Sequence, residues 1–207
     1  MKLLVATRNR GKIAELTRLF AALEIELVDL SAFEDAPDVV EDAHDFAGNA
    51  TKKARVLARF AGLPTIADDS GLEVDALGLA PGVRSARYAG EHGDDEANNE
   101  RVLRELEDVP DGARTARFRC ALAFVDFEGP LSERAHVEHG VIEGAILRAP
   151  RGEGGFGYDP LFLPVGETRT TAEMPAAEKN AISHRAEASR RMCRFLETYL
   201  VRREARR

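Results

Sequence analysis

The chain has 207 residues, with 29 Lys and Arg against 36 Asp and Glu, and its formal net charge is −7. This acidic balance, with a basic block only in the tail 202–207, argues against a basic face for nucleic acid. With 44% hydrophobic residues, the composition is that of a globular protein, and the length fits a single domain over residues 1–207. Cys120 and Cys193 are too few for a disulfide framework, and no apolar run has membrane-spanning length. We therefore expect a soluble cytoplasmic protein that binds neither nucleic acid nor a membrane.

The first third of the chain alternates between strand and helix patterns. A short continuous apolar run at residues 2–7 predicts a buried strand, and a turn at 8–11 precedes a helix with apolar residues at helical spacing. Residues 25–30 alternate like a second strand. A further helix follows Asp45, its predicted N-cap, and ends before a short strand at 64–67.

The remainder of the chain contains a hairpin pattern and a final helix. Asp94 is the predicted N-cap of another helix. Residues 116–126 and 135–142 alternate as two strands of a long hairpin, and the last helix is expected to begin near Ala181. Strand–helix alternation followed by a hairpin predicts an α/β fold with a mixed central sheet flanked by helices.

Asp68 and Asp69 follow the predicted strand 64–67 and are themselves followed by Ser70 and Gly71. Asp and Gly favour turns, so the acidic pair can simply begin one. Alternatively, a strand that stops at two carboxylates delivers negative charge to a sheet edge, where it faces a metal or a ligand. Neighbouring side chains of an extended segment point to opposite faces, so we do not expect the two Asp to share one role.

Glu41 and Asp42 lie in a loop before a predicted helix. Together with Asp68 and Asp69 they offer hard carboxylate oxygens, which are the ligands of a magnesium ion that keeps most of its waters. The alternative is an acidic loop that is only solvated. No His and Cys residues cluster at ligand spacing, which argues against zinc.

Residues 7–12 form a predicted strand–turn–helix junction. The free amides at the helix start, with Lys12 and the side chains of Thr7 and Asn9, can form an anion-binding corner. The spacing is not that of a Walker loop. The alternative is an ordinary Asn–Gly turn with a surface lysine.

Two later segments also carry chemistry. Residues 154–160 combine three glycines with two aromatic rings. The backbone can therefore approach a flat ligand closely, and a ring can stack on a base. The alternative is that both rings fill the core. Residues 178–185 are expected at the start of the last helix. Positive groups are unfavourable at a helix start, and this segment carries Lys179, His184 and Arg185. Their presence indicates a phosphate or a keto oxygen as partner. The alternative is that they face solvent.

Taken together, these motifs resemble one family, the inosine triphosphate pyrophosphatases, which hydrolyse non-standard purine nucleoside triphosphates. The resemblance covers nearly the whole chain and is greatest to the bacterial and archaeal members. It rests on the following segments: residues 7–12; Phe46 with Asn49 and Ala50; 67–72 continued through 80–83 to 85–88; 154–160; and 178–185.

The resemblance implies an elongated α/β fold of two lobes with a central cleft, a homodimer, and a Mg²⁺-dependent reaction. That reaction converts dITP, ITP and XTP to the monophosphate plus pyrophosphate. The resemblance also implies that Asp69 accepts a proton and that Glu41 and Asp69 hold the metal. The substrate-binding residues it implies are Thr7, Arg8, Asn9, Arg10, Gly11, Lys12, Ser70, Phe156, Gly157, Tyr158, Asp159, Lys179, His184 and Arg185.

Three positions depart from the family's pattern. Gly48 replaces a Glu, Arg8 stands where small residues are common, and Leu79 stands where Gly is common. We expect Arg8 to add charge for a triphosphate and Leu79 to be a local packing change. Alternative functions are a pyrophosphatase for modified pyrimidine nucleotides, a phosphatase, and a nucleotide-binding regulator without catalysis.

Overall fold

The strands of the chain form one mixed sheet. The computed structural model describes residues 1–205. The sheet has six strands in the order β2-β1-β3-β4-β5-β6, with β1 parallel to β2 and β3 and with β6 antiparallel to β5. The strands are β1 (Lys2–Val5), β2 (Glu26–Asp29), β3 (Thr65–Val74), β4 (Thr115–Val125), β5 (Ala135–Ile146) and β6 (Phe162–Pro164).

The helices confirm the predicted α/β class and two predicted caps. They are α1 (Arg10–Leu19), α2 (Phe46–Ala61), α3 (Asp95–Glu105), α4 (Ala176–Ile182) and α5 (His184–Glu204), with 3₁₀ turns at Leu30–Ala32, Asp75–Leu77, Gly82–Arg87 and Asp111–Ala113. Asp45 caps α2 by accepting from the Gly48 amide at 2.7 Å, and Asp94 caps α3 by accepting from the Ala97 amide at 3.0 Å. Within residues 1–205, no helix combines the length and hydrophobicity needed to cross a membrane.

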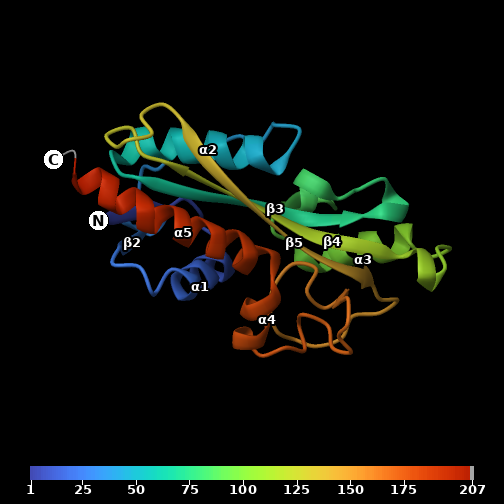
Figure 1. Cartoon of the computed structure of the whole chain (residues 1–207). Helices are drawn as coiled ribbons and strands as arrows, with labels where there is room; N and C mark the ends of the chain where they lie inside the picture. The colour runs from blue at the N-terminus through green and yellow to red at the C-terminus, as the bar shows by residue number, and fades with distance from the viewer. Residues whose placement is uncertain (206–207) are drawn as a thin grey trace. The chain divides into compact units, whose positions relative to one another are not determined.

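The chain divides into two compact units, each with its own core. The first unit comprises Met1–Asp69, Cys120–Gly140 and the described residues from Arg185 onward, and the second comprises Ser70–Arg119 and Val141–His184. In the first unit α1 and α5 contribute to one core with the strands, and Figure 1 shows α2 on the opposite side of the strands from α5. The single domain expected over residues 1–207 stays a prediction.

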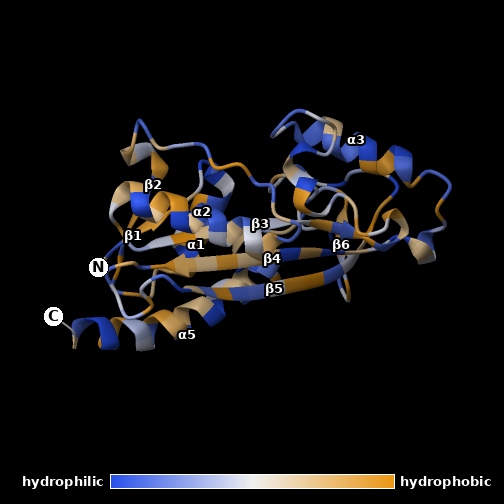
Figure 2. Ribbon diagram, turned by 90° about the horizontal axis from the view of Figure 1, so that it is seen from above, coloured by the Kyte–Doolittle hydropathy of each residue, from blue (hydrophilic) through white to orange (hydrophobic). Residues whose placement is uncertain are grey.

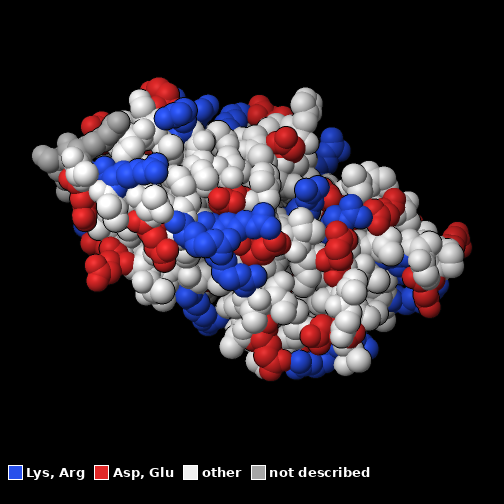
Figure 3. Space-filling model, in the orientation of Figure 1, with Lys and Arg blue, Asp and Glu red and all other residues white. Residues whose placement is uncertain are grey.

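Each core is built from the apolar residues of its strands and helices. Figure 2 shows hydrophobic residues along β4 and a mostly hydrophilic α3. The buried residues of the first core are Leu3, Val5, Leu16, Phe20, Ile66, Cys120, Leu122, Phe124, Ala188, Met192, Leu196 and Tyr199. Those of the second are Leu72, Val74, Val102, Leu106, Ala116, Phe118, Ile146, Tyr158, Leu161 and Phe162. On the face drawn in Figure 3, acidic and basic side chains are interspersed, as the composition leads us to expect.

The strand predicted at 64–67 does not stop at the acidic pair, and this expectation was wrong. β3 continues to Val74 and is the third of six strands, so Asp68 and Asp69 lie within an interior strand and not at a sheet edge. Gly71 is typical of a turn in the sequence, but in the structure it allows β3 to pack closely against Ser85. A Cβ at this position would lie 2.3 Å from the Ser85 hydroxyl oxygen, which accepts a hydrogen bond from the Leu72 amide at 2.9 Å.

The expected start of the last helix near Ala181 was also wrong. The segment forms two helices, α4 and α5, separated by Ser183 with an extended backbone (φ −67°, ψ 154°). Lys179 therefore lies in the last turn of α4, where a cation is favoured by the helix dipole, and it needs no anion to explain it. Of the three residues expected at an unfavourable helix start, only His184 and Arg185 lie at one, the start of α5.

Candidate active site

The Asp68 carboxylate of the first unit is buried and neutralised by two cations. Its side chain is 0% exposed, Lys12 forms an ion pair with Oδ1, and Arg185 donates from Nε to Oδ2 at 3.0 Å. The Cys120 thiol donates to the same Oδ2 at 3.1 Å. Burial by itself raises a carboxyl pKa, but the charges of Arg185 and Lys12 outweigh it and hold the pKa of Asp68 well below its usual range. Asp68 is therefore a permanently charged group of the framework.

Asp69, the next residue of the same strand, has the opposite environment. The residue is 5% exposed, and its Oδ2 is buried with no hydrogen-bond partner among residues 1–205. Burial raises the pKa of Asp69 to about 6; the charges of Lys12 and Lys53 oppose this shift and that of Glu41 adds to it. The alternation of side chains along an extended strand explains how adjacent carboxylates meet such different surroundings.

Glu41 belongs to an irregular loop that α2 holds in place. Lys53 of α2 forms an ion pair with Glu41 and also donates to the backbone oxygen of Asp68 at 2.9 Å. The side-chain oxygen of Asn49, a residue that is 0% exposed, accepts from the Ala43 amide at 2.9 Å. One helix thus fixes both the backbone of the loop and its acidic side chain. We call Glu41, Asp68 and Asp69 the acidic cluster.

Gly48 allows this loop to lie close to α2. A Cβ at position 48 would be 2.7 Å from the Cβ of Ala43, a separation that real Cβ atoms do not reach. The Glu that the resemblance leads us to expect at this position would not fit the present loop. The departure at Gly48 therefore has a packing reason.

The oxygens of Glu41 and Asp69 suit a divalent cation. The charge of Glu41 raises the pKa of Asp69, the buried Oδ2 of Asp69 lacks a protein partner among residues 1–205, and a cation would favour the charged form that burial opposes. Within the same residues, no group of three or more His, Cys, Asp and Glu side chains is arranged to hold a metal. Two carboxylates alone match an ion such as Mg²⁺, which retains several waters.

The start of α1 is closed by side chains of the predicted anion-binding corner. The Asn9 side-chain oxygen accepts from the Lys12 amide at 3.0 Å, and the Thr7 hydroxyl accepts from the Asn9 amide at 3.2 Å. In the first turn, Arg10 is exposed and Gly11 is half-buried. The predicted corner is therefore present as a capped helix start, with the Lys12 ammonium paired to Asp68 and the Arg10 side chain exposed.

Two arginines that the resemblance assigns to substrate are held by carboxylates of the first unit. Arg8 forms an ion pair with Asp38 at 2.6 Å, so its charge is already partnered. Arg185 is 2% exposed and forms ion pairs with Glu15 and Asp68. The structure thus brings Lys12, Asp68 and Arg185 together, whereas Arg8 is held by Asp38 in the loop that also contains Glu41.

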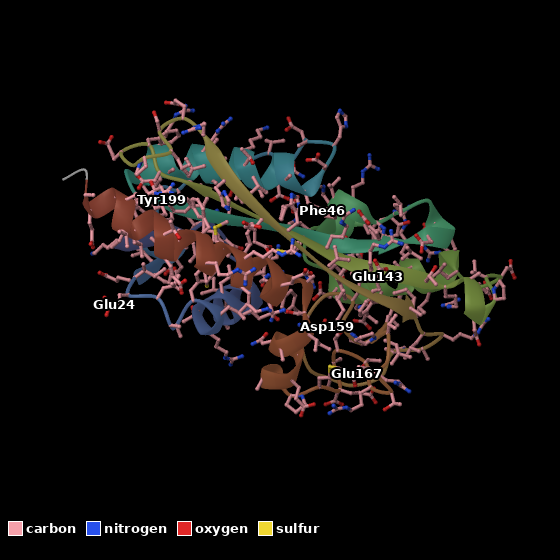
Figure 4. All side chains as sticks on the ribbon, in the orientation of Figure 1. Glu24, Phe46, Glu143, Asp159, Glu167 and Tyr199 are labelled. Atoms are coloured by element: carbon pink, nitrogen blue, oxygen red, sulfur yellow. The ribbon has the colours of Figure 1, made fainter. Side chains whose placement is uncertain are left out.

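In the second unit, Asp159 organises the loop of residues 152–159, which we call the glycine loop. Its Oδ2 accepts from the Phe156 amide at 2.9 Å and pairs with the Lys179 ammonium at 2.6 Å, and its Oδ1 accepts from the Thr171 hydroxyl at 2.8 Å. Figure 4 shows Asp159 in the loop beside α4. Gly155 is required here because its φ is +76° and a Cβ would lie 2.1 Å from Asp159 Oδ2.

The two aromatic rings of the glycine loop have different environments. Phe156 is half-buried, with the Lys179 ammonium 4.7 Å from its ring centroid. Tyr158 is 4% exposed, belongs to the core, and donates its hydroxyl to the Ser85 backbone oxygen at 2.8 Å. Of the two rings expected as stacking platforms, only that of Phe156 remains accessible to a ligand.

The remaining predicted residues of the second unit are His184 and Ser70. The His184 ring stacks on Phe118, with centroids 5.0 Å apart and planes at 14°, and the residue is 7% exposed. Ser70 is half-buried in β3. The structure thus places both against the framework of their unit.

Sequence reasoning missed three buried or half-buried groups that organise the first unit. Glu15, Asn49 and Lys53 were not among the predicted site residues, although each contacts one of them or its loop. A signal was present for two of the three: Glu15 and Lys53 directly precede the buried Leu16 and Ala54 on their helices. A charged residue at the border of an apolar helix face is partly buried along its stem, and this position is the signal that the sequence offered.

Comparison with known proteins identifies similar sequences over almost the whole chain. The model of the Ham1 family matches residues 3–195. A dITP/XTP pyrophosphatase of Geobacter sulfurreducens is 50% identical over 187 residues, covering 90% of this chain and 92% of the relative. A dITP/XTP pyrophosphatase of Desulforamulus reducens is 48% identical, covering 99% of this chain and 100% of the relative.

Solved structures of similar proteins support the same relationship. A HAM1 protein from Coxiella burnetii superposes with a TM-score of 0.85 at 42% identity, covering 96% of this chain and 99% of that one. The dITP/XTP pyrophosphatase of Mycobacterium abscessus gives a TM-score of 0.75 at 46% identity, covering 93% and 98%. The resemblance drawn from the motifs is confirmed.

Proposed function

This chain belongs to the Ham1 family, and we propose that it is a nucleoside triphosphate pyrophosphatase that converts dITP, ITP and XTP to the monophosphate and pyrophosphate. Such a reaction would remove non-standard purines from the nucleotide pool and so protect DNA and RNA. The observation that supports this chemistry best is the buried Asp69, whose pKa is raised to about 6 beside Glu41 and two lysines. The choice of substrates is supported by the names of the relatives.

We propose Mg²⁺ as the cofactor, held by Glu41 and Asp69. When bound, the ion would neutralise phosphate charge and lower the pKa of a coordinated water. The donor set of two hard carboxylates supports Mg²⁺ over softer metals.

Within the first unit, Asp69 orients the attacking water and takes its proton. Without metal the pKa of Asp69 is raised to about 6; a bound cation would favour its charged form, which is the form that can take a proton from a water whose own pKa the ion lowers. Lys12, with a side chain that is 16% exposed, supplies positive charge for the pyrophosphate leaving group, and Thr7 and Asn9 shape the helix start that carries it. Asp68 keeps the Lys12 ammonium in place.

Within the second unit, we assign the phosphates and sugar to Lys179 and Ser70 and the base to the glycine loop and His184. The half-buried Phe156 ring supports stacking on a purine. The family resemblance assigns Arg185, a residue of the first unit, to the 6-keto oxygen of the base, because a guanidinium only donates hydrogen bonds and adenine would present an amino group to it.

A panel of nucleoside triphosphates with identification of the products tests the proposed function. We expect monophosphate and pyrophosphate from dITP, ITP and XTP, and turnover of ATP lower by roughly 10²-fold or more because a donor would remain unpaired. Release of orthophosphate would indicate a phosphatase instead. A preference for modified pyrimidines, or no release at all, would support the pyrimidine-directed enzyme or the non-catalytic regulator.

We also propose, from the family resemblance, that the protein is a cytoplasmic homodimer. Light scattering after size-exclusion chromatography measures the mass of the assembly directly. A monomer at micromolar concentration would contradict the dimer without affecting the proposed reaction.

A further inference from the structure

Two side chains of α3 contact the backbone of a single residue in the glycine loop. Asp95 Oδ2 accepts from the Gly157 amide at 2.6 Å, and Asn99 Nδ2 donates to the Gly157 carbonyl oxygen at 2.9 Å. Both polar groups of one backbone residue are therefore satisfied by one helix. All three residues belong to the second unit.

The spacing and polarity of this pair fit its target. Residues 95 and 99 are four apart in a helix and so lie on the same face. The acceptor at 95 meets the amide and the donor at 99 meets the carbonyl, and the reverse arrangement could not make both bonds. Asp95 also lies in the first turn of α3, where a carboxylate is stabilised by the helix dipole.

The side-chain oxygen of Asn99 indicates that the contact to Gly157 determines how the Asn99 amide is oriented. Asn99 Oδ1 is buried and has no hydrogen-bond partner among residues 1–205. An unpaired buried acceptor is unfavourable. The Asn99 side chain nonetheless donates to the glycine loop. This donor has no role in capping α3, since the N-cap of that helix is Asp94.

Gly157 lies between the two aromatic residues of the loop, so fixing it fixes the direction of Phe156. Tyr158 is anchored in the core, Phe156 is tied through its amide to Asp159, and Gly157 has a left-handed backbone with φ +64°. Holding the amide and the carbonyl of Gly157 sets the peptide planes on both of its sides. The position of the accessible Phe156 ring then follows from these anchors.

We propose that Asp95 and Asn99 are positioning residues that hold the glycine loop in the conformation in which Phe156 can stack on the base of the substrate. This inference rests on the proposed function for the identity of the ligand. It does not rest on that function for the loop conformation itself, which can be measured without any nucleotide.

The decisive variants keep the shape of the side chain and change its hydrogen-bond polarity and its charge. Asn99→Asp keeps the shape of the side chain but replaces the donor by an acceptor that faces the Gly157 carbonyl, whereas Asp95→Asn retains an acceptor for the Gly157 amide. We expect Asn99→Asp to raise the KM for dITP roughly 10-fold with kcat within about 3-fold, as the loss of one polar contact predicts. Asp95→Asn should remain within about 3-fold of the parent in both constants, and Asp95→Ala should resemble Asn99→Asp.

Glu96→Gln, an exposed change in the same helix turn, is the matched control and should leave both constants unchanged. Hydrogen–deuterium exchange without nucleotide supplies the independent measurement. In Asn99→Asp the peptide covering 154–160 should exchange roughly 10-fold faster, while peptides of α3 keep their protection.

The outcomes separate this inference from the proposed function. Unchanged exchange of the loop in Asn99→Asp overturns the positioning role, whatever the activity. Faster exchange with an unchanged KM also overturns it, because the loop conformation would then not matter to the substrate. If the parent protein releases no pyrophosphate from dITP, ITP or XTP, the proposed function fails, and the exchange measurement alone decides whether the α3 pair holds the loop.

Discussion

The acidic cluster of the first unit and the glycine loop of the second unit are built by different forces. In the acidic cluster, long charged side chains from three helices pair with the carboxylates of one strand and one loop. In the glycine loop, backbone amides and carbonyls are the main partners, and positive φ angles at Gly152, Gly155 and Gly157 make the close turns possible. Charge placement determines the first region, and backbone conformation determines the second.

This difference predicts different responses to substitution. Removing one charge from a buried network leaves another charge unpaired, at a cost of several kcal/mol, unless the removed charge was itself unfavourable. Adding one methyl group to a tight loop instead strains the backbone and leaves electrostatics unchanged. Asp68 and Asp69 offer a test of the first statement, and Gly155 and Gly157 of the second.

Asp69→Asn should show the largest effect on activity. We expect kcat to fall by roughly 10³-fold, because proton removal by a positioned base contributes about 10²–10⁴-fold. The folded state should be no less stable than that of the parent, since burial already disfavours the charged form of Asp69. Steady-state kinetics with dITP and thermal unfolding measure both effects; turnover near that of the parent would remove Asp69 from the mechanism.

Asp68→Asn should instead lower stability. The neutral amide leaves Lys12 and Arg185 with less compensating charge, so we expect unfolding to become easier by about 3 kcal/mol. Asp38→Asn is the control, because its ion pair with Arg8 is exposed and should contribute less than about 1 kcal/mol. Equal losses in urea unfolding of the two variants would contradict the buried network.

The two carboxylates should also give opposite dependences of stability on pH in metal-free protein. The pKa of Asp68 is lower in the folded state, so its contribution is present above about pH 4 and is lost as the pH falls below that value. The pKa of Asp69 is raised to about 6, so its contribution is present below about pH 4 and is lost as the pH rises toward 6. Urea unfolding with chelator, carried out between about pH 3 and about pH 7, extends roughly one unit beyond these two pKa values. Over this range Asp69→Asn should show a flatter dependence of stability on pH than the parent above about pH 4.

Gly155→Ala and Gly157→Ala form a pair in the glycine loop. Both residues have positive φ, but only at 155 would a Cβ collide, at 2.1 Å from Asp159 Oδ2. We expect losses of stability of about 2–3 kcal/mol for Gly155→Ala and about 1 kcal/mol for Gly157→Ala. Chemical denaturation measures both, and similar losses would mean that φ alone governs the loop.

Leu79→Gly should give the smallest effect and the opposite sign. Leu79 has φ 71° and is 46% exposed, so its departure from the family's Gly is a matter of backbone conformation and not the packing change that was expected. Glycine relieves the left-handed strain, and we expect a gain of about 0.5–1 kcal/mol. A loss of stability would show that the Leu side chain contributes more than the strain costs.

Much of the fold follows from local patterns. The spacing of apolar residues identified β1, α1 and α2. The caps Asp45 and Asp94 were placed correctly because an N-cap side chain accepts a hydrogen bond from an amide only three residues further along the chain. The course of β3 past Asp69 was not predictable, since Asp, Ser and Gly favour turns locally and only the neighbouring strands override that preference. The break at Ser183 was missed for a related reason, because the residue carries no strong breaker signal.

The amino-acid sequence by itself determined the α/β class and the family, because these depend on residue type and on spacing along the chain; the site residues that it indicates stay a prediction. The tertiary structure alone decided which partner each charge takes. Asp68 and Arg185 are separated by 117 positions, and Asp95 and Gly157 by 62, so no local pattern links either pair. Burial then makes adjacent, chemically identical carboxylates differ: Asp68 is bonded directly to Lys12 and Arg185, whereas for Asp69 the charges of Lys12 and Lys53 do not outweigh desolvation and the nearby Glu41.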